Sequence, residues 1–183
     1  MIAPGPGTLL IAEPFLKDPN FMRTVVLLCE HREEGSFGFV INRKYEFRLK
    51  ELMNDMEDLD LPIYYGGPVR NDSLHFLHQY PDLIPEGQEI DKDLFWGGDF
   101  EEAIRLLREG LIDPERIRFY IGYSGWGQGQ LQEELKERSW LTVKANRKIV
   151  FEPEEATIWK EALRLLGGDY EQLVNYPIDP QLN

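Results

Sequence analysis

The sequence predicts an α+β protein with a mixed or barrel-like sheet, and two observations indicate this class. Short apolar runs and period-two alternation, both typical of strands, dominate the first half of the 183 residues. Apolar stripes at helical spacing dominate the second half. Because strands and helices do not alternate regularly along the chain, a doubly wound parallel fold is disfavoured. A chain of this length is expected to form one domain, residues 1–183, with a sizeable core.

The first three strands are predicted at 8–12, 23–30 and 36–42. The first is short and apolar, and the second contains a continuous apolar run typical of a central strand covered on both faces. The third alternates aromatic or aliphatic residues with small ones, which is period-two patterning. A polar, glycine-containing connection joins the last two strands as a hairpin. Before the second strand, Asp18 is expected to form a local ion pair with Arg23 in a turn.

Five further strands are predicted at 62–65, 74–77, 117–123, 140–143 and 148–151. The first of these ends at Gly66-Gly67-Pro68, which is a strong turn signal.

Three helices are predicted in the second half of the chain. One has a capping-box-like start at Asp99, and Gly110 fits its stop. The next is expected at 129–138, with acidic residues early and basic residues late, as the helix macrodipole favours. The last begins with Pro153 in its first turn and ends at a glycine pair. The tail, residues 176–183, is expected to be irregular.

Acidic charge is concentrated in the middle of the chain. The formal net charge is −13, and residues 49–115 hold 17 acidic but only 5 basic side chains. Such a surface repels phosphate backbones, so direct nucleic-acid binding is not expected. A solvated acidic face that aids solubility is the default interpretation, and a docking surface for a basic protein partner is the alternative.

The sequence predicts a cytoplasmic protein. It contains no run of about 18 apolar residues, so no membrane-spanning helix is expected. Its first residues lack the basic region and the long apolar core of a signal peptide. The single cysteine, Cys29, lies inside an apolar run and cannot form an internal disulfide.

The glycine-rich segment 122–131 is the main functional candidate, predicted as a loop between a strand and a helix. Its glycine spacing matches neither a dinucleotide fingerprint nor a Walker sequence, and Trp126 stands where a nucleophile elbow needs glycine. A structural turn packed by Trp126 is the default interpretation, and a ligand or partner site and a catalytic loop are the alternatives. As a binding site the segment would use Tyr123, Gly125, Trp126, Gly127 and Gln130.

Three histidines and one asparagine complete the candidates. His31, at a strand end, could be an acid–base or binding group, although a structural role is the default. Asn42 ends a strand, where its side chain can hydrogen-bond the backbone or contribute to binding. His75 and His78 fall on opposite faces of a strand, so they cannot share a metal ion. We expect no metal site and no cofactor.

Several short sequence blocks of the chain, taken together, form a combination that is specific to one family. They are Gly7-Thr8-Leu9-Leu10-Ile11-Ala12, Asp18-Pro19-Asn20-Phe21, Gly35-Ser36-Phe37-Gly38-Phe39-Val40-Ile41-Asn42-Arg43, Gly66-Gly67-Pro68-Val69 and Gly122-Tyr123-Ser124-Gly125-Trp126. Together they resemble the bacterial YqgE/AlgH family, an uncharacterised family of the UPF0301 type. The resemblance implies a mixed, mainly antiparallel sheet with a small barrel-like core surrounded by helices. It implies little about activity, although some members are named as transcriptional regulators linked to alginate synthesis.

These observations favour a non-enzymatic binding or regulatory module. Its partner would be an unknown protein or a small-molecule ligand, and any effect on transcription would be indirect, through a protein partner. No catalytic constellation is visible in the sequence, so an enzyme is not favoured. The alternative is an enzyme acting on a small substrate, with a pocket near residues 122–130 that His31 would join if folding brings them together.

Overall fold

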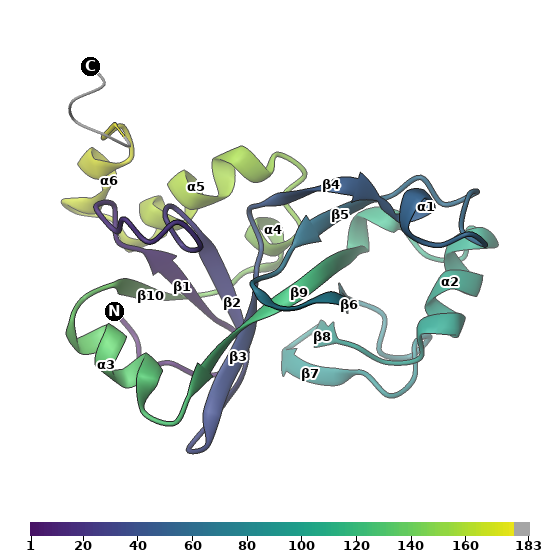
Figure 1. The fold of residues 1–183 in the computed structure, drawn as a ribbon, viewed down its shortest axis with the longest axis horizontal. Coiled ribbons are helices and arrows are strands. Elements are labelled where there is room, and N and C mark those ends of the chain that lie inside the picture. The colour runs from purple at the N-terminus through teal and green to yellow at the C-terminus, as the bar shows by residue number, and fades with distance from the viewer. Residues whose placement is uncertain (178–183) are drawn as a thin grey trace.

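The computed structural model describes residues 1–177 and confirms the α+β class, with ten strands and six α-helices in that part of the chain (Figure 1). The strands are β1 (Thr8–Ala12), β2 (Val25–Arg32), β3 (Gly35–Val40), β4 (Lys44–Arg48), β5 (Pro62–Tyr65), β6 (Val69–His78), β7 (Gln88–Asp91), β8 (Leu94–Trp96), β9 (Ile117–Gly127) and β10 (Trp140–Lys144). The helices are α1 (Leu49–Leu52), α2 (Phe100–Arg108), α3 (Gln130–Lys136), α4 (Arg147–Val150), α5 (Ile158–Leu166) and α6 (Tyr170–Leu173). Two short 3-10 turns, η1 (Pro114–Arg116) and η2 (Glu155–Thr157), complete the elements.

The sheet is mixed and mainly antiparallel, as the resemblance implies. Its strands follow the order β10-β1-β2-β3-β9-β6-β8-β7, while β4 pairs with β5 and β5 pairs with β9. The β5–β9 pair is parallel, and the other pairs are antiparallel. Within residues 1–177 the two end strands, β10 and β7, do not pair with each other, so the sheet is not closed into a barrel.

Strand β9 organises the sheet because it pairs with three other strands, β3, β5 and β6. Its 11 residues include the strand predicted at 117–123 and also 124–127, which were expected in the loop after that strand, so the expected end of the strand is wrong. The reason is long-range pairing: Gly125 lies opposite Phe37 and Gly127 lies opposite Gly35 on β3. Close approach of the backbones requires glycine at Gly122 and at Gly35 of the neighbouring strand β3, where an added Cβ would overlap a carbonyl oxygen, but not at Gly125 or Gly127.

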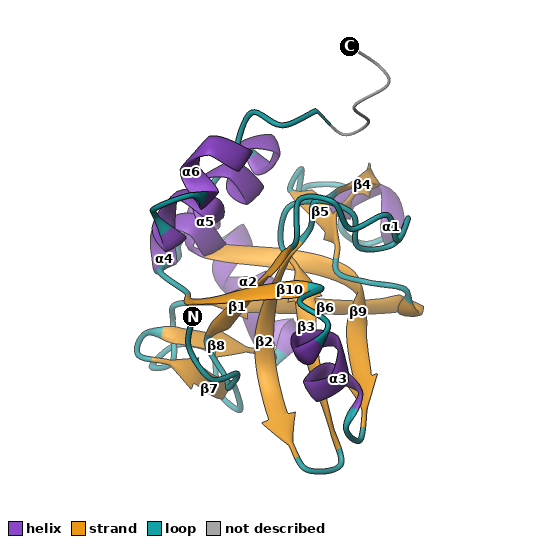
Figure 2. Cartoon of the chain, turned by 90° about the vertical axis from the view of Figure 1, so that its left-hand side faces the viewer, coloured by secondary structure: helices purple, strands orange, loops and turns teal. Residues whose placement is uncertain are grey.

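Helices cover the two faces of the sheet separately. Alternate residues of β1 and β2, such as Leu9 and Leu27, pack with Trp159 and Leu163 of α5. The residues between them pack on the other face with Leu131 of α3. A further cluster lies under α2 and joins it to β5, β6 and β9. Figure 2 shows α4, α5 and α6 grouped together, with α3 apart from them on the other side of β1 and β2.

The helix predictions are confirmed in part. For α2, the Asp99 side chain accepts a hydrogen bond from the Glu102 N–H at 3.1 Å, which is the predicted N-terminal cap. The strand predicted at 148–151 is wrong, because these residues belong mainly to the short helix α4. There the Asn146 side chain caps the Ile149 N–H at 2.9 Å, and a capping asparagine was overlooked in the sequence.

The last long helix begins later than predicted. Pro153 precedes it, and α5 begins at Ile158 after the turn η2. The predicted Asp18–Arg23 ion pair is wrong, because the Arg23 guanidinium lies over the Trp159 ring at 4.7 Å and donates to the Tyr176 carbonyl. The irregular tail predicted at 176–183 falls largely outside the described residues. None of the helices within residues 1–177 has the length and apolar character that a membrane crossing requires.

Candidate functional site

The predicted segment 122–127 borders a pocket of about 780 Å³, which we call the aromatic pocket. Its walls carry Phe37 of β3, His75 of β6, Trp96 of β8 and Tyr123 of β9. Four of the predicted site residues line it: Tyr123, Gly125, Trp126 and Gly127. Gln130, His31 and Asn42 do not.

The aromatic side chains hold one another in edge-to-face contacts. The Phe37 ring centroid lies 4.9 Å from that of Trp96 and 5.8 Å from that of Tyr123, with interplanar angles of 83° and 74°. His75 meets Tyr123 at 5.9 Å and 87°. Such pairs are preferred because a positive ring edge meets a negative ring face. The pocket therefore has walls that are fixed before any ligand enters.

Gly125 keeps the middle of the aromatic pocket open. It lies directly opposite Phe37 in the β3–β9 pair, where any other residue would place a side chain beside the rings. A Cβ added there would meet the Tyr123 ring at 3.5 Å and the Val69 side chain at 3.8 Å, which are ordinary contacts. The backbone of Gly125 thus tolerates a side chain, but the pocket would be filled by one.

His75 brings a polar group into these aromatic walls. Burial lowers the pKa of its imidazole, which favours the neutral ring at neutral pH. Its Nε2 atom is buried and has no hydrogen-bond partner among residues 1–177. A buried polar atom without a partner is unfavourable, so His75 is an exception to the usual pairing of buried polar groups.

Trp126 and Gln130 fasten the end of β9 to α3. The Trp126 side chain is only 5% exposed, and its Nε1 donates to Glu134 Oε2 at 2.8 Å. Trp140 Nε1 donates to the same oxygen at 2.7 Å. Gln130 Oε1 accepts from the Gly127 N–H at 3.0 Å. Both side chains thus have structural partners, and their part in binding stays a prediction.

Asn42 and His31 also have structural partners. The Asn42 side chain accepts from the Val25 N–H and donates to the Arg23 carbonyl, each at 2.9 Å, which closes the turn before β2. His31 Nδ1 lies 2.6 Å from Ser36 Oγ across the β2–β3 hairpin. His31 is therefore near the predicted segment, since Ser36 pairs with Trp126, but it does not enter the aromatic pocket.

Sequence reasoning missed three wall residues of the pocket, namely Phe37, His75 and Trp96. The alternation along β3 did place Phe37 on a face with Phe39, and that was the only signal available. The contributions of β6 and β8 depend on pairings between segments far apart in the chain, which local patterns do not reveal. In contrast to His75, whose Nε2 has no partner, His78 is held locally: its Nε2 lies 3.0 Å from the Gly97 carbonyl oxygen, and its Nδ1 accepts from the Tyr80 N–H at 3.1 Å.

The fold and the pocket define a class: an α+β protein with one mixed sheet and a ligand-sized aromatic cavity beside its central strand. The model of the AlgH-like family matches residues 9–171, so the chain belongs to this family. It is 44% identical to a UPF0301 protein of Chlorobium limicola over 178 residues, covering 97% of this chain and 95% of the relative. A UPF0301 protein of Cytophaga hutchinsonii is 42% identical, with 97% and 98% covered.

Solved structures agree with this assignment. The solution structure of the AlgH protein from Pseudomonas aeruginosa matches with a TM-score of 0.72 and 32% identity, covering 97% of this chain and 98% of that one. The crystal structure of protein DIP2367 from Corynebacterium diphtheriae matches with a TM-score of 0.78 over 96% and 94%. At 20% identity the second match concerns the fold alone. The molecular function of the family is uncharacterised.

Proposed function

We propose that this protein is a non-enzymatic binding module and that the aromatic pocket is its ligand site. The observation that carries the proposal is a cavity of about 780 Å³ lined by four aromatic residues and His75. Ligand sites in proteins are typically concave and mostly apolar, and this pocket is both. Its position beside the glycine-rich end of β9 also gives that unusual segment a purpose.

The walls favour a planar, largely apolar group. Ring faces and edges bind such groups by stacking, and a neutral imidazole adds one polar position without adding charge. Glu30, Arg32 and Glu34 also line the pocket, and Glu30 pairs with Arg32 at 3.6 Å, so the lining carries a formal charge of −1. The ligand would be a small aromatic molecule or an aromatic side chain of a protein partner.

As a regulator, the protein would act on transcription through a protein partner. The net charge of −13 opposes direct contact with a phosphate backbone. We also propose a cytoplasmic location, since the single cysteine is buried within β2 and the chain has no second cysteine to pair with. Both statements extend the proposal and rest on charge and composition.

The test is a thermal-shift and fluorescence screen of aromatic metabolites against wild type and Gly125→Leu. Leucine at this position fills the aromatic pocket, so any ligand bound there should lose affinity by about tenfold or more. Gly5→Leu is the matched control, because a Cβ at Gly5 has no neighbour within 4 Å. A ligand that binds Gly125→Leu as tightly as wild type would place its site elsewhere and contradict the proposal.

The alternative function, an enzyme acting on a small substrate, has one observation in its favour. The hydrogen bond between His31 and Ser36 pairs a base with a hydroxyl. Ser36 also lines the aromatic pocket, which places this pair at the cavity. Turnover of a compound bound in the aromatic pocket, lost in Ser36→Ala, would favour this alternative over a binding module.

A further inference from the structure

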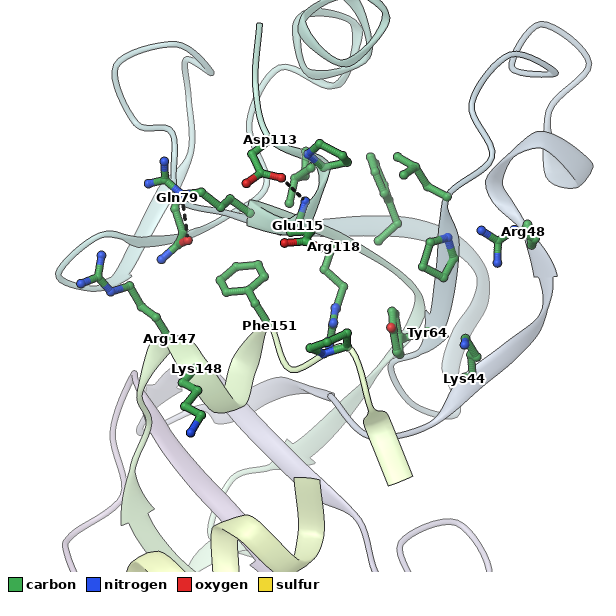
Figure 3. A pocket seen from close by; sticks show the side chains of 17 residues that line it. Lys44, Arg48, Tyr64, Gln79, Asp113, Glu115, Arg118, Arg147, Lys148 and Phe151 are labelled. Carbon is green, nitrogen blue, oxygen red and sulfur yellow. Dashed lines mark hydrogen bonds between the residues drawn. The ribbon is translucent and has the colours of Figure 1, made fainter. Parts of the chain in front are cut away.

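A second cavity lies elsewhere in the molecule and shares no lining residue with the aromatic pocket. It has a volume of about 690 Å³ and lies among β4, β5, the start of β9 and α4 (Figure 3). We call it the basic pocket, because six basic and only two acidic side chains line it. The basic residues are Lys44, Arg48, Arg116, Arg118, Arg147 and Lys148. A lining with a formal charge of +4 is unexpected in a chain with a net charge of −13.

Three of these cations are compensated by carboxylates. Lys44 lies 3.9 Å from Glu155, Arg147 lies 3.7 Å from Asp93, and Arg48 pairs with Asp60. The other three, Arg116, Arg118 and Lys148, form no ion pair with a carboxylate among residues 1–177. Together with the two lining carboxylates, Asp113 and Glu115, these three cations leave the basic pocket a formal charge of +1.

Arg118 is the central group of the basic pocket. It is only 8% exposed, and its guanidinium donates to the carbonyls of Val150 at 3.2 Å and Glu152 at 2.8 Å. The same group lies over the Tyr64 ring at 4.2 Å. These contacts use neutral partners and leave other N–H donors of the guanidinium available. A buried cation without an anionic partner is unfavourable, and a bound anion would supply that partner.

The other two uncompensated cations, Arg116 and Lys148, line the same pocket. Arg116 is held by Gln79, whose Oε1 accepts from its Nε at 3.2 Å, and by the Tyr80 ring at 4.6 Å. Lys148 comes from α4, and its side chain extends away from Phe151 and Arg118 at the edge of the pocket (Figure 3). Guanidinium groups match the geometry of phosphate oxygens, and a lysine adds a flexible positive charge. Cations from three separate elements thus line one cavity, with the buried Arg118 as the group held inside it.

From this arrangement we propose that the basic pocket binds a small organic phosphate. The phosphate would bind at Arg118, with Arg116 and Lys148 adding positive charge at the edges of the cavity, and the organic part would contact the apolar wall that includes Phe151. A long polyanion is disfavoured by the acidic surface of the molecule, whereas a small anion meets only the local positive charge. The proposal is independent of the aromatic pocket and stands or fails separately.

Calorimetric titration with ADP, adenosine and inorganic pyrophosphate tests this proposal. ADP should bind about tenfold or more tightly than adenosine, since only ADP carries the phosphates. Raising NaCl from about 0.05 M to about 0.2 M should weaken ADP binding several-fold, because salt screens the contact. Pyrophosphate should bind more weakly than ADP, because it lacks the organic part.

Variants locate the site. Arg116→Gln/Lys148→Gln should weaken ADP binding about tenfold or more, since it removes two of the three uncompensated cations. The control Lys17→Gln/Lys92→Gln makes the same charge change at two exposed lysines outside the pocket and should leave binding unchanged. Gly125→Leu should also leave ADP binding unchanged, which separates this site from the aromatic pocket. The proposal is overturned if ADP does not bind, if adenosine or pyrophosphate binds as tightly, or if the basic-pocket variant binds like wild type.

Discussion

His75 lies in the proposed ligand site, and its environment also affects the free energy of unfolding. It contacts Phe39 and Tyr123 in the aromatic walls, at centroid distances of 5.5 Å and 5.9 Å. A planar imidazole fits between these rings, but its buried Nε2 has no partner. At the scale of one residue, the pocket thus holds a group that packs well and hydrogen-bonds poorly. This combination makes the protonation of His75 unfavourable in the folded state.

Burial lowers the pKa of both His75 and His78, although the Gly97 hydrogen bond opposes this shift at His78. As the pH falls below about 6.5, the unfolded chain therefore takes up protons before the folded one. The free energy of unfolding should be constant just above this pH and should decrease below it. Urea unfolding at several pH values from about 7.5 to about 5.5 measures the effect.

The variant His75→Phe tests the assignment. It keeps a planar ring and removes the unpaired nitrogen, so it should be as stable as wild type at neutral pH or slightly more stable. Its stability should fall less between neutral pH and about pH 5.5, because only His78 still contributes. An unchanged pH dependence in this variant would show that His75 is not responsible.

At the scale of elements, β9 depends on glycine where it crosses its neighbours. Gly122 has a φ of 68°, and a Cβ placed there would overlap the Gly67 carbonyl oxygen. The Gly66-Gly67 turn therefore approaches β9 so closely that a side chain at position 122 would overlap it. The positive φ of Gly122 disfavours a side chain there as well. This contact joins β5 and β6 to β9 and so holds the two pockets in their places.

Gly122→Ala should destabilise the protein by at least about 2 kcal/mol, since overlap is added to backbone strain. Gly110→Ala is the matched control: its φ is 67°, but an added Cβ has no neighbour within 4 Å. That variant should lose only about 1 kcal/mol, from conformation alone. Denaturant unfolding of the two variants gives the difference, and equal losses would mean that the close approach at Gly122 is unimportant.

At the scale of the whole molecule, charge is separated between surface and cavity. The acidic side chains concentrate in residues 49–115, whereas the cations of the basic pocket lie in segments on either side, at 44–48, 116–118 and 147–148. Folding brings these distant cations together around one hollow. The molecule is thus expected to repel large anions while it accepts a small one.

A gel-shift experiment with double-stranded DNA examines this expectation. At about 0.15 M salt we expect no retarded band at micromolar protein, because counterion release gives little affinity to a surface with net negative charge. Arg116→Gln/Lys148→Gln should behave in the same way as wild type. Tight, sequence-specific retardation at this salt concentration would refute the view that any effect on transcription is indirect.

The sequence by itself determined the class of fold and most of the regular elements. Period-two patterning and apolar runs are local, so 62–65 was predicted with its observed bounds, and 8–12 likewise. The cap at Asp99 is also local, because the bond to Glu102 spans three residues. The glycine-rich segment was singled out as a candidate, and its conformation was predicted wrongly, since a strand made by partners about 90 residues away looks like a loop to a local pattern.

The tertiary structure alone decided what the two pockets contain. Phe37, His75, Trp96 and Tyr123 meet because β3, β6, β8 and β9 are neighbours in the sheet. Arg116, Arg118 and Lys148 line one pocket because the α4 segment packs against the start of β9, where Arg118 donates to the Val150 and Glu152 carbonyls. Periodicity reports which face of an element is apolar, but it does not report which elements share an edge. A site assembled across several strands is therefore fixed by long-range pairing and packing, which only the folded chain displays.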